Sequence, residues 1–174
     1  ALVPLILFTM LMWMGLATSW NIIGGYTGYV SFGHAAFMAV GGFTLGLGQR
    51  YLEVGTTFGI ELIGLILLAG LVPAALAVLI AYPFLRLHGG YFAIAMLGFQ
   101  LALKEAFTAF DFLGGGIGMP ASLQSPGFAS TGMLLYYLMA IVVLVTIAIA
   151  AYIRRTEFGY GLFAIRENED AAES

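Results

Sequence analysis

The strongest constraint in this sequence is its opening stretch, which contains no Asp, Glu, Lys or Arg before Arg50. A helix needs about 20 apolar residues to cross the hydrocarbon of a bilayer, so this stretch has room for two crossings. Charged residues make up 9% of the chain and hydrophobic residues 61%, whereas a soluble domain carries about 25% charged residues. The sequence therefore predicts an all-α integral membrane protein, a polytopic bundle of transmembrane helices.

Five apolar stretches are long enough to form these helices. They cover residues 2–19, 22–48, 62–85, 91–110 and 133–153. Together they predict a transmembrane domain over residues 1–153. The remaining segment, residues 154–174, is polar and holds more than half of the charged residues in the chain. We expect it to be a separate segment in water at one face of the membrane.

Basic residues indicate which face this is, because short loops rich in Lys and Arg remain in the cytoplasm. Alternating crossings place Arg50 and Lys104 outside, and they place four basic residues inside: Arg86, Arg154, Arg155 and Arg166. The bias favours a cytoplasmic 154–174. The start of the first span would then lie outside, so we expect this chain to be a fragment of a longer membrane protein.

The second span is unusually rich in glycine and in small polar side chains. Its first part contains Gly24, Gly25, Thr27, Gly28, Ser31, Gly33 and His34. This composition predicts a broken or locally unwound second helix. Transporters place such breaks at substrate sites, since freed peptide groups can bind a polar solute. His34 favours a cavity or a partner over lipid, but a neutral histidine bonded to a neighbouring helix explains it equally well.

Small residues also recur along one face of the second span. They are Gly28, Ala35, Ala39, Gly42 and Gly46. Stripes of this kind let two helices approach closely in lipid. We therefore expect this face to pack against another helix rather than to bind a ligand.

Several other chemistries find no support in the residues. Ser31 and His34 lie one helical turn apart, but no acid accompanies them, which disfavours an intramembrane protease. Two distant histidines and no cysteine make no metal site. The chain has no P-loop for a nucleotide and no basic face for nucleic acid. We predict no catalytic residue, no metal and no cofactor in this chain.

Four segments, in this order, make the sequence recognisable. They read GYTGYVSFGHAAFMAVGGF (25–43), LRLHGGYFAIAMLGF (85–99), GGGIGMP (114–120) and RTEFGYGLFAIRENEDAAE (155–173). They resemble, respectively, the glycine-rich second span, an internal loop with the next span, the external loop and the ATPase-docking loop of permeases from branched-chain amino acid ABC importers. The resemblance covers most of the chain.

The resemblance implies a permease that works with partner proteins in a bacterial inner membrane. The partners would be a second permease subunit, cytoplasmic ABC ATPases that bind the ATP, and a periplasmic or extracellular solute-binding protein, with lipid around the spans. ATPase closure would push the coupling segment and alternate the access of the path. The external loop over residues 111–132 would meet the binding protein or gate the outer mouth, unless it is a passive connection.

We assign three sets of candidate residues on this basis. The translocation path would be lined by Thr27, Gly28, Ser31, Gly33, His34 and Tyr91. The ATPase coupling segment would use Phe158, Gly159, Leu162, Ile165, Arg166, Glu167, Asp170, Ala171 and Ala172, with glycines at 159 and 161 allowing the turn after the last span. The outer gate would use Gly114, Gly115, Gly116 and Pro120.

Other functions remain open at this point. Related permeases move urea and short amides, so branched-chain amino acids are one substrate class among several. A secondary transporter or channel without an ATPase is a second possibility, but it has no need of a docking segment at 158–173. A proton-relay subunit of a respiratory assembly should carry charges at mid-membrane, and these spans do not. Co-purification of an ATPase would separate the first class from the others.

Overall fold

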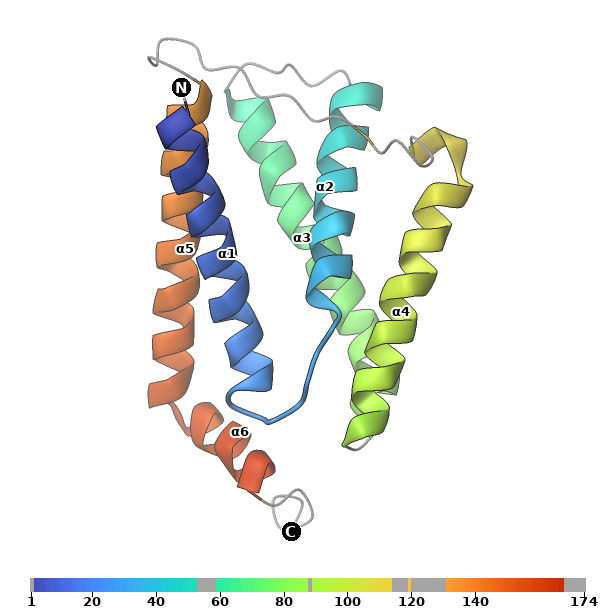
Figure 1. The fold of residues 1–174 in the computed structure, drawn as a ribbon, viewed down its shortest axis with the longest axis vertical. Helices are drawn as coiled ribbons and strands as arrows, with labels where there is room; N and C mark the ends of the chain where they lie inside the picture. The colour runs from blue at the N-terminus through green and yellow to red at the C-terminus, as the bar shows by residue number, and fades with distance from the viewer. Residues whose placement is uncertain (1, 53–58, 88, 114–118, 120–130, 168–174) are drawn as a thin grey trace. The chain divides into compact units, whose positions relative to one another are not determined.

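The computed structural model describes residues 2–52, 59–87, 89–113, 119 and 131–167 (Figure 1). All regular structure in these ranges is helical, which confirms the predicted all-α class. The elements in chain order are α1 (Leu2–Gly24), α2 (His34–Tyr51), α3 (Ile60–Phe84), α4 (Gly90–Ala109), the 3-10 turn η1 (Asp111–Leu113), α5 (Thr131–Arg155) and α6 (Glu157–Glu167).

Four of the described helices, α1, α3, α4 and α5, are long and apolar enough to cross a membrane. Large apolar side chains on these helices are exposed, among them Val78 on α3 and Leu144 on α5. Such surface is stable in lipid and costly in water, because burial of apolar area is the main stabilising term in water. The protein is therefore a multi-pass membrane protein.

The second predicted span, residues 22–48, differs from the structure. Residues 22–24 complete α1, residues 25–33 are not helical, and α2 begins only at His34. The non-helical segment contains Gly28, whose φ of 78° is readily adopted by glycine and rarely by other residues. The predicted break is thus a non-helical segment that precedes the helix, and α2 itself runs without interruption.

Helix α2 is not among the four apolar candidates, and at 1.5 Å per residue it is about 27 Å long. That α2 nevertheless crosses the membrane is supported by the relative direction of α1 and α5. Helices α1 and α5 run parallel, because Gly15 faces Val143 and Tyr26 reaches Ala150. The chain must cross an odd number of times between two parallel spans. Among the described helices, α2 is the one that can add a third crossing to α3 and α4.

The chain forms two compact units, which are described separately. The first contains residues 1–31 and 127–174, and therefore α1, α5 and α6. Helix α1 lies along α5 (Figure 1). Gly15 permits this approach: a Cβ there would lie 3.3 Å from Cγ2 of Val143. Helix α6 turns away from the end of α5.

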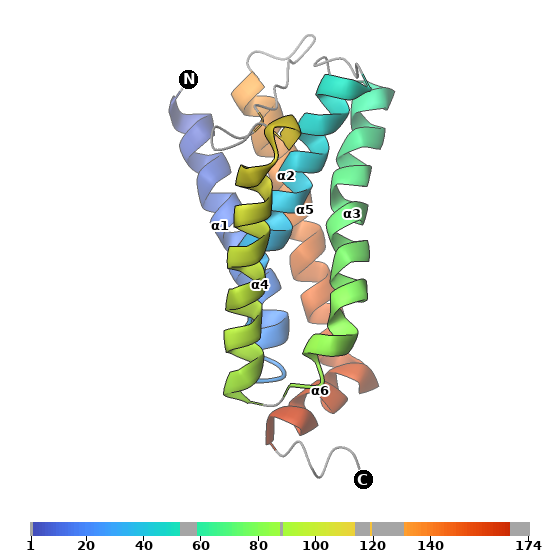
Figure 2. The ribbon, with the colours of Figure 1, turned by 90° about the vertical axis from the view of Figure 1, so that its right-hand side faces the viewer.

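The second unit contains residues 32–126, with α2, α3, α4 and η1. Helix α2 runs along α3 in the opposite direction (Figure 2). Pro73 lies inside α3 and has no N–H, so the carbonyl of Ala69 loses its helical partner. Gly41 of α2 packs against this carbonyl, where a Cβ would lie 2.9 Å from the oxygen. Gly48 packs against the side chain of Leu65.

The predicted small-residue stripe is therefore not the surface that meets α3. Gly42 would have nothing within 4 Å of an added Cβ, and Gly46 lies against Met119. Gly28 is outside the helix altogether. The contacting glycines are Gly41 and Gly48, seven residues apart. Small residues occur on several faces of α2, and the proline-freed carbonyl of α3 determines which face packs.

Alanine at position 41 should destabilise this helix pair, whereas alanine at position 42 should not. A Cβ at 41 meets a backbone oxygen that cannot rotate away, and overpacking of this kind costs about 1–3 kcal/mol. A Cβ at 42 meets nothing and gains up to about 1 kcal/mol of helix propensity. Thermal unfolding of both variants of the full-length protein in detergent checks this. Equal melting temperatures for Gly41→Ala and Gly42→Ala would contradict the close approach.

Candidate functional site

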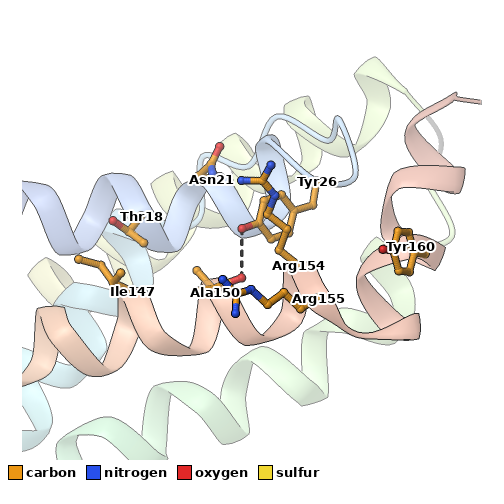
Figure 3. Close-up of a pocket in the computed structure, with 9 residues that line it drawn as sticks. Thr18, Asn21, Tyr26, Ile147, Ala150, Arg154, Arg155 and Tyr160 are labelled. Carbon is orange, nitrogen blue, oxygen red and sulfur yellow. Dashed lines mark hydrogen bonds between the residues drawn. The ribbon is translucent and has the colours of Figure 1, made fainter.

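The most connected site in the first unit surrounds Tyr26, just after α1 (Figure 3). The Tyr26 side chain is buried, and its hydroxyl donates a hydrogen bond of 3.2 Å to the Ala150 carbonyl in α5. Its ring lies 5.2 Å from the ring of Phe163 in α6, at an angle of 46°. This single residue therefore joins the end of α1 to both α5 and α6.

The last turn of α6 also contacts the chain just after α1, through Arg166. The Nη1 group of Arg166 donates a hydrogen bond of 2.9 Å to the carbonyl of Gly25. The stem of Arg166 also lies over Gly28, since a Cβ at Gly28 would be 3.3 Å from its Cγ. We call residues 25–28 the Tyr26 turn. Helix α6 and the Tyr26 turn are thus fixed to each other by one polar and one aromatic contact.

Gly159 sets the angle between α5 and α6. It is buried, and a Cβ at this position would clash with the carbonyl oxygen of Ile153. That same oxygen accepts a 2.8 Å hydrogen bond from the hydroxyl of Thr156. Gly161 would have nothing near an added Cβ. The turn after the last span therefore needs glycine at 159 but not at 161, which corrects the expectation that both glycines allow it.

The other predicted coupling residues lie at several positions on α6. Phe158 and Glu167 are exposed, while Leu162 and Ile165 are half-buried. Phe163 faces the Tyr26 ring within its own unit. Asp170, Ala171 and Ala172 lie outside the described residues. The assignment of these residues to a coupling surface remains a prediction.

The predicted path residues divide between the two units. Thr27, Gly28 and Ser31 belong to the first unit, where the Ser31 carbonyl accepts a 2.9 Å hydrogen bond from Nε1 of Trp20. The Thr27 hydroxyl donates to the carbonyl of Ile23 at 2.7 Å. The second unit holds Gly33, His34 and the exposed Tyr91. The outer-gate residues Gly114, Gly115, Gly116 and Pro120 lie outside the described residues.

Sequence reasoning missed Tyr26 as a functional candidate, and it expected Phe163 to contact the ATPase rather than Tyr26. Both are aromatic residues among many in an apolar chain, and nothing local marks them. Their contact joins positions far apart in the sequence, so only the folded structure reveals it. A partial signal exists, because Phe163 lies on a short amphipathic helix whose apolar side must pack on something.

Comparison with known proteins decides the family. Residues 3–174 match the family described as branched-chain amino acid transport system / permease component. The chain belongs to this family. This confirms the resemblance to permeases of branched-chain amino acid transport systems that the sequence showed.

Two relatives of this chain are the high-affinity branched-chain amino acid transport system permease proteins LivM of Salmonella typhimurium (strain LT2) and Escherichia coli (strain K12). The first is 38% identical and the second 35% identical, each over 79 residues. Each match covers 45% of this chain and 17% of the relative's length. No solved structure matches this chain.

Proposed function

We propose that this permease forms part of the translocation path of an ABC importer for branched-chain amino acids, and that α6 couples the path to a cytoplasmic ATPase. The observation that carries the proposal is the attachment of α6 to the Tyr26 turn. A short amphipathic helix directly after a spanning helix is a suitable docking element, and this one is joined to two spans. The family and the names of the two LivM relatives support the same assignment.

The geometry suggests how a push on α6 reaches the membrane. At its start, α6 is packed on the last turn of α5 through Gly159. At its end, Arg166 and Phe163 hold the Tyr26 turn, which follows α1 directly. A displacement of α6 therefore acts on both α1 and α5. The chain then continues from the Tyr26 turn through residues 29–33 into α2, so the same displacement pulls on the segment proposed to line the path.

The surface of α6 offered to the ATPase contains the aromatic side chain of Phe158, which is 67% exposed. Buried aromatic side chains commonly dominate binding at protein interfaces. Because α6 is the polar end of this unit, we propose that Phe158 inserts into a cleft of the ATPase, with Glu157 and Glu167 at the rim of the contact.

The remaining parts of the proposal rest on the family to which the chain belongs. A solute-binding protein would deliver the amino acid to the outer face, and a second permease subunit would complete the path in a bacterial inner membrane. A urea or short-amide substrate is the alternative within the same mechanism. Competition of labelled leucine uptake by isoleucine, valine, urea and acetamide in proteoliposomes separates these substrates.

Loss of the Phe158 ring should weaken ATPase binding while the permease stays folded. Truncation of a buried aromatic anchor costs about 2 kcal/mol or more, so we expect Phe158→Ala to bind the ATPase roughly 30-fold more weakly. Tyr152→Ala is the matched control, because Tyr152 is 72% exposed but lies on the spanning helix α5. Affinity is measured on the full-length permease with its purified ATPase. Equal affinities for both variants and the wild type would argue against docking through α6.

A further inference from the structure

A pocket of about 750 Å³ lies in the first unit where α1, α5 and α6 meet (Figure 3). Its polar lining includes Asn21 of α1, Tyr160 of α6, and the two arginines Arg154 and Arg155 in the last turn of α5. In Figure 3 the Arg155 side chain extends back along α5, whereas the Arg154 side chain reaches across toward Asn21 and Tyr26. Among its described lining residues there is no Asp or Glu. These residues give the pocket a formal charge of +2.

These donors have no other partner in the described part of the chain. Neither arginine forms an ion pair there, and neither Asn21 nor Tyr160 forms a side-chain hydrogen bond. Each guanidinium presents five N–H donors in a planar fork that fits the oxygens of a phosphate. Two such groups beside an amide and a phenol form a site suited to a tetrahedral anion with several oxygens.

The position of the pocket along the helices indicates the source of that anion. Helices α1 and α5 run parallel, and each is long and apolar enough to cross a membrane. The arginines mark the end of α5, where the helix leaves the hydrocarbon. Ile147 also lines the pocket, seven residues earlier, which is about 10 Å deeper along the axis. The pocket thus has cations at its water end and an alkyl wall at its hydrocarbon end.

We propose that this pocket binds the headgroup of an anionic phospholipid, with Arg154 and Arg155 pairing with the oxygens of its phosphate and Asn21 and Tyr160 donating hydrogen bonds to other oxygens of the headgroup. Basic pockets between spanning helices at a membrane face suit anionic headgroups. A zwitterionic lipid would bring an ammonium group for which the lining has no carboxylate. Because Tyr160 lies on α6, the bound lipid would also join α6 to the two spans.

The test compares lipids on the full-length permease in detergent. The probes are dioleoylphosphatidylglycerol, dioleoylphosphatidylcholine and inorganic phosphate, and the readouts are lipid affinity by native mass spectrometry and thermal stabilisation. We expect the phosphatidylglycerol to bind more tightly than the other two and to raise the melting temperature. The variant Arg154→Gln with Arg155→Gln should bind it roughly tenfold to thirtyfold more weakly. The measurement needs no ATPase, so its result is independent of the proposed coupling.

Two further variants separate a specific pocket from general attraction. Arg50→Gln with Arg86→Gln removes the same charge from helix ends of the second unit and should leave the affinity unchanged. Arg154→Lys with Arg155→Lys keeps the charge but loses the planar fork, so its affinity for the lipid should be lower than that of the wild type. This variant provides the test if the glutamine variant fails to fold. Equal losses for the two charge-removing variants would overturn the proposal. So would equal binding of phosphatidylcholine, or binding of inorganic phosphate as tight as that of the lipid.

Discussion

Alanine at Gly159 is expected to abolish most ATP-driven uptake while the spans remain inserted. A Cβ at this position clashes with the carbonyl of Ile153 and would lie 3.1 Å from Cα of Arg154. Both are backbone atoms, so α6 itself must move away, and its contacts with the Tyr26 turn are lost. An overpacking cost of about 1–3 kcal/mol lowers the ratio of molecules with α6 in place to molecules with α6 displaced by roughly fivefold to 150-fold. Uptake of labelled leucine by reconstituted full-length complexes measures the loss.

Gly161→Ala is the matched control on the same helix. An added Cβ at 161 meets nothing, and alanine favours a helix over glycine by about 1 kcal/mol. Uptake by this variant should equal that of the wild type or slightly exceed it. If the two alanine variants lose uptake equally, the loss is caused by replacing any glycine of α6, and the prediction that it is caused by the close packing at 159 is wrong.

The second large effect is expected at Tyr26. Tyr26→Ala removes a buried ring, and truncation of a large buried aromatic residue costs about 3–5 kcal/mol. Tyr26→Phe keeps the ring against Phe163 and loses only the hydrogen bond to Ala150, a net cost of about 1 kcal/mol. Alanine should therefore release α6 from the turn, and phenylalanine should retain it. Amide hydrogen exchange over 157–167 reports the release directly, as faster exchange throughout α6.

Tyr152→Ala serves as the control for this series, since Tyr152 is an exposed tyrosine of the same unit. It should leave the exchange rates of α6 unchanged. Exchange of α6 at the wild-type rate in Tyr26→Ala would contradict the attachment of α6 through Tyr26. Faster exchange in Tyr152→Ala as well would show only that the unit as a whole is destabilised.

The apolar runs predicted the long helices well, for a physical reason. Charge-free stretches of spanning length have one stable solution in a bilayer, because every backbone group must be bonded internally. Helices α3, α4 and α5 accordingly begin and end within two residues of the ranges 62–85, 91–110 and 133–153. The non-helical segment before α2 was harder to place from the sequence. It contains Gly28 with a positive φ, and sequence alone does not show which of several nearby glycines adopts it.

Contacts between distant residues account for what the sequence could not reveal. The choice of Gly41 over Gly42 as the packing residue depends on a carbonyl of α3 that Pro73 sets free. The attachment of α6 depends on Tyr26 meeting Phe163 and on Arg166 reaching Gly25. Nothing in the local sequence marks the residues of either pair, and their contact can be seen only in the folded structure. Gly159, by contrast, was predicted correctly as a turn residue because its requirement is local.

The most direct test of the central claim is the number of leucine molecules transported per ATP hydrolysed, measured on reconstituted complexes of the full-length permease and its ATPase. The variants are Tyr26→Ala, Phe163→Ala and the two combined. If α6 transmits the ATPase motion through this ring contact, all three should lower the ratio by a similar factor, because the second substitution removes a contact that is already lost. A wild-type ratio in all three variants, or losses that multiply in the double variant, would contradict the account.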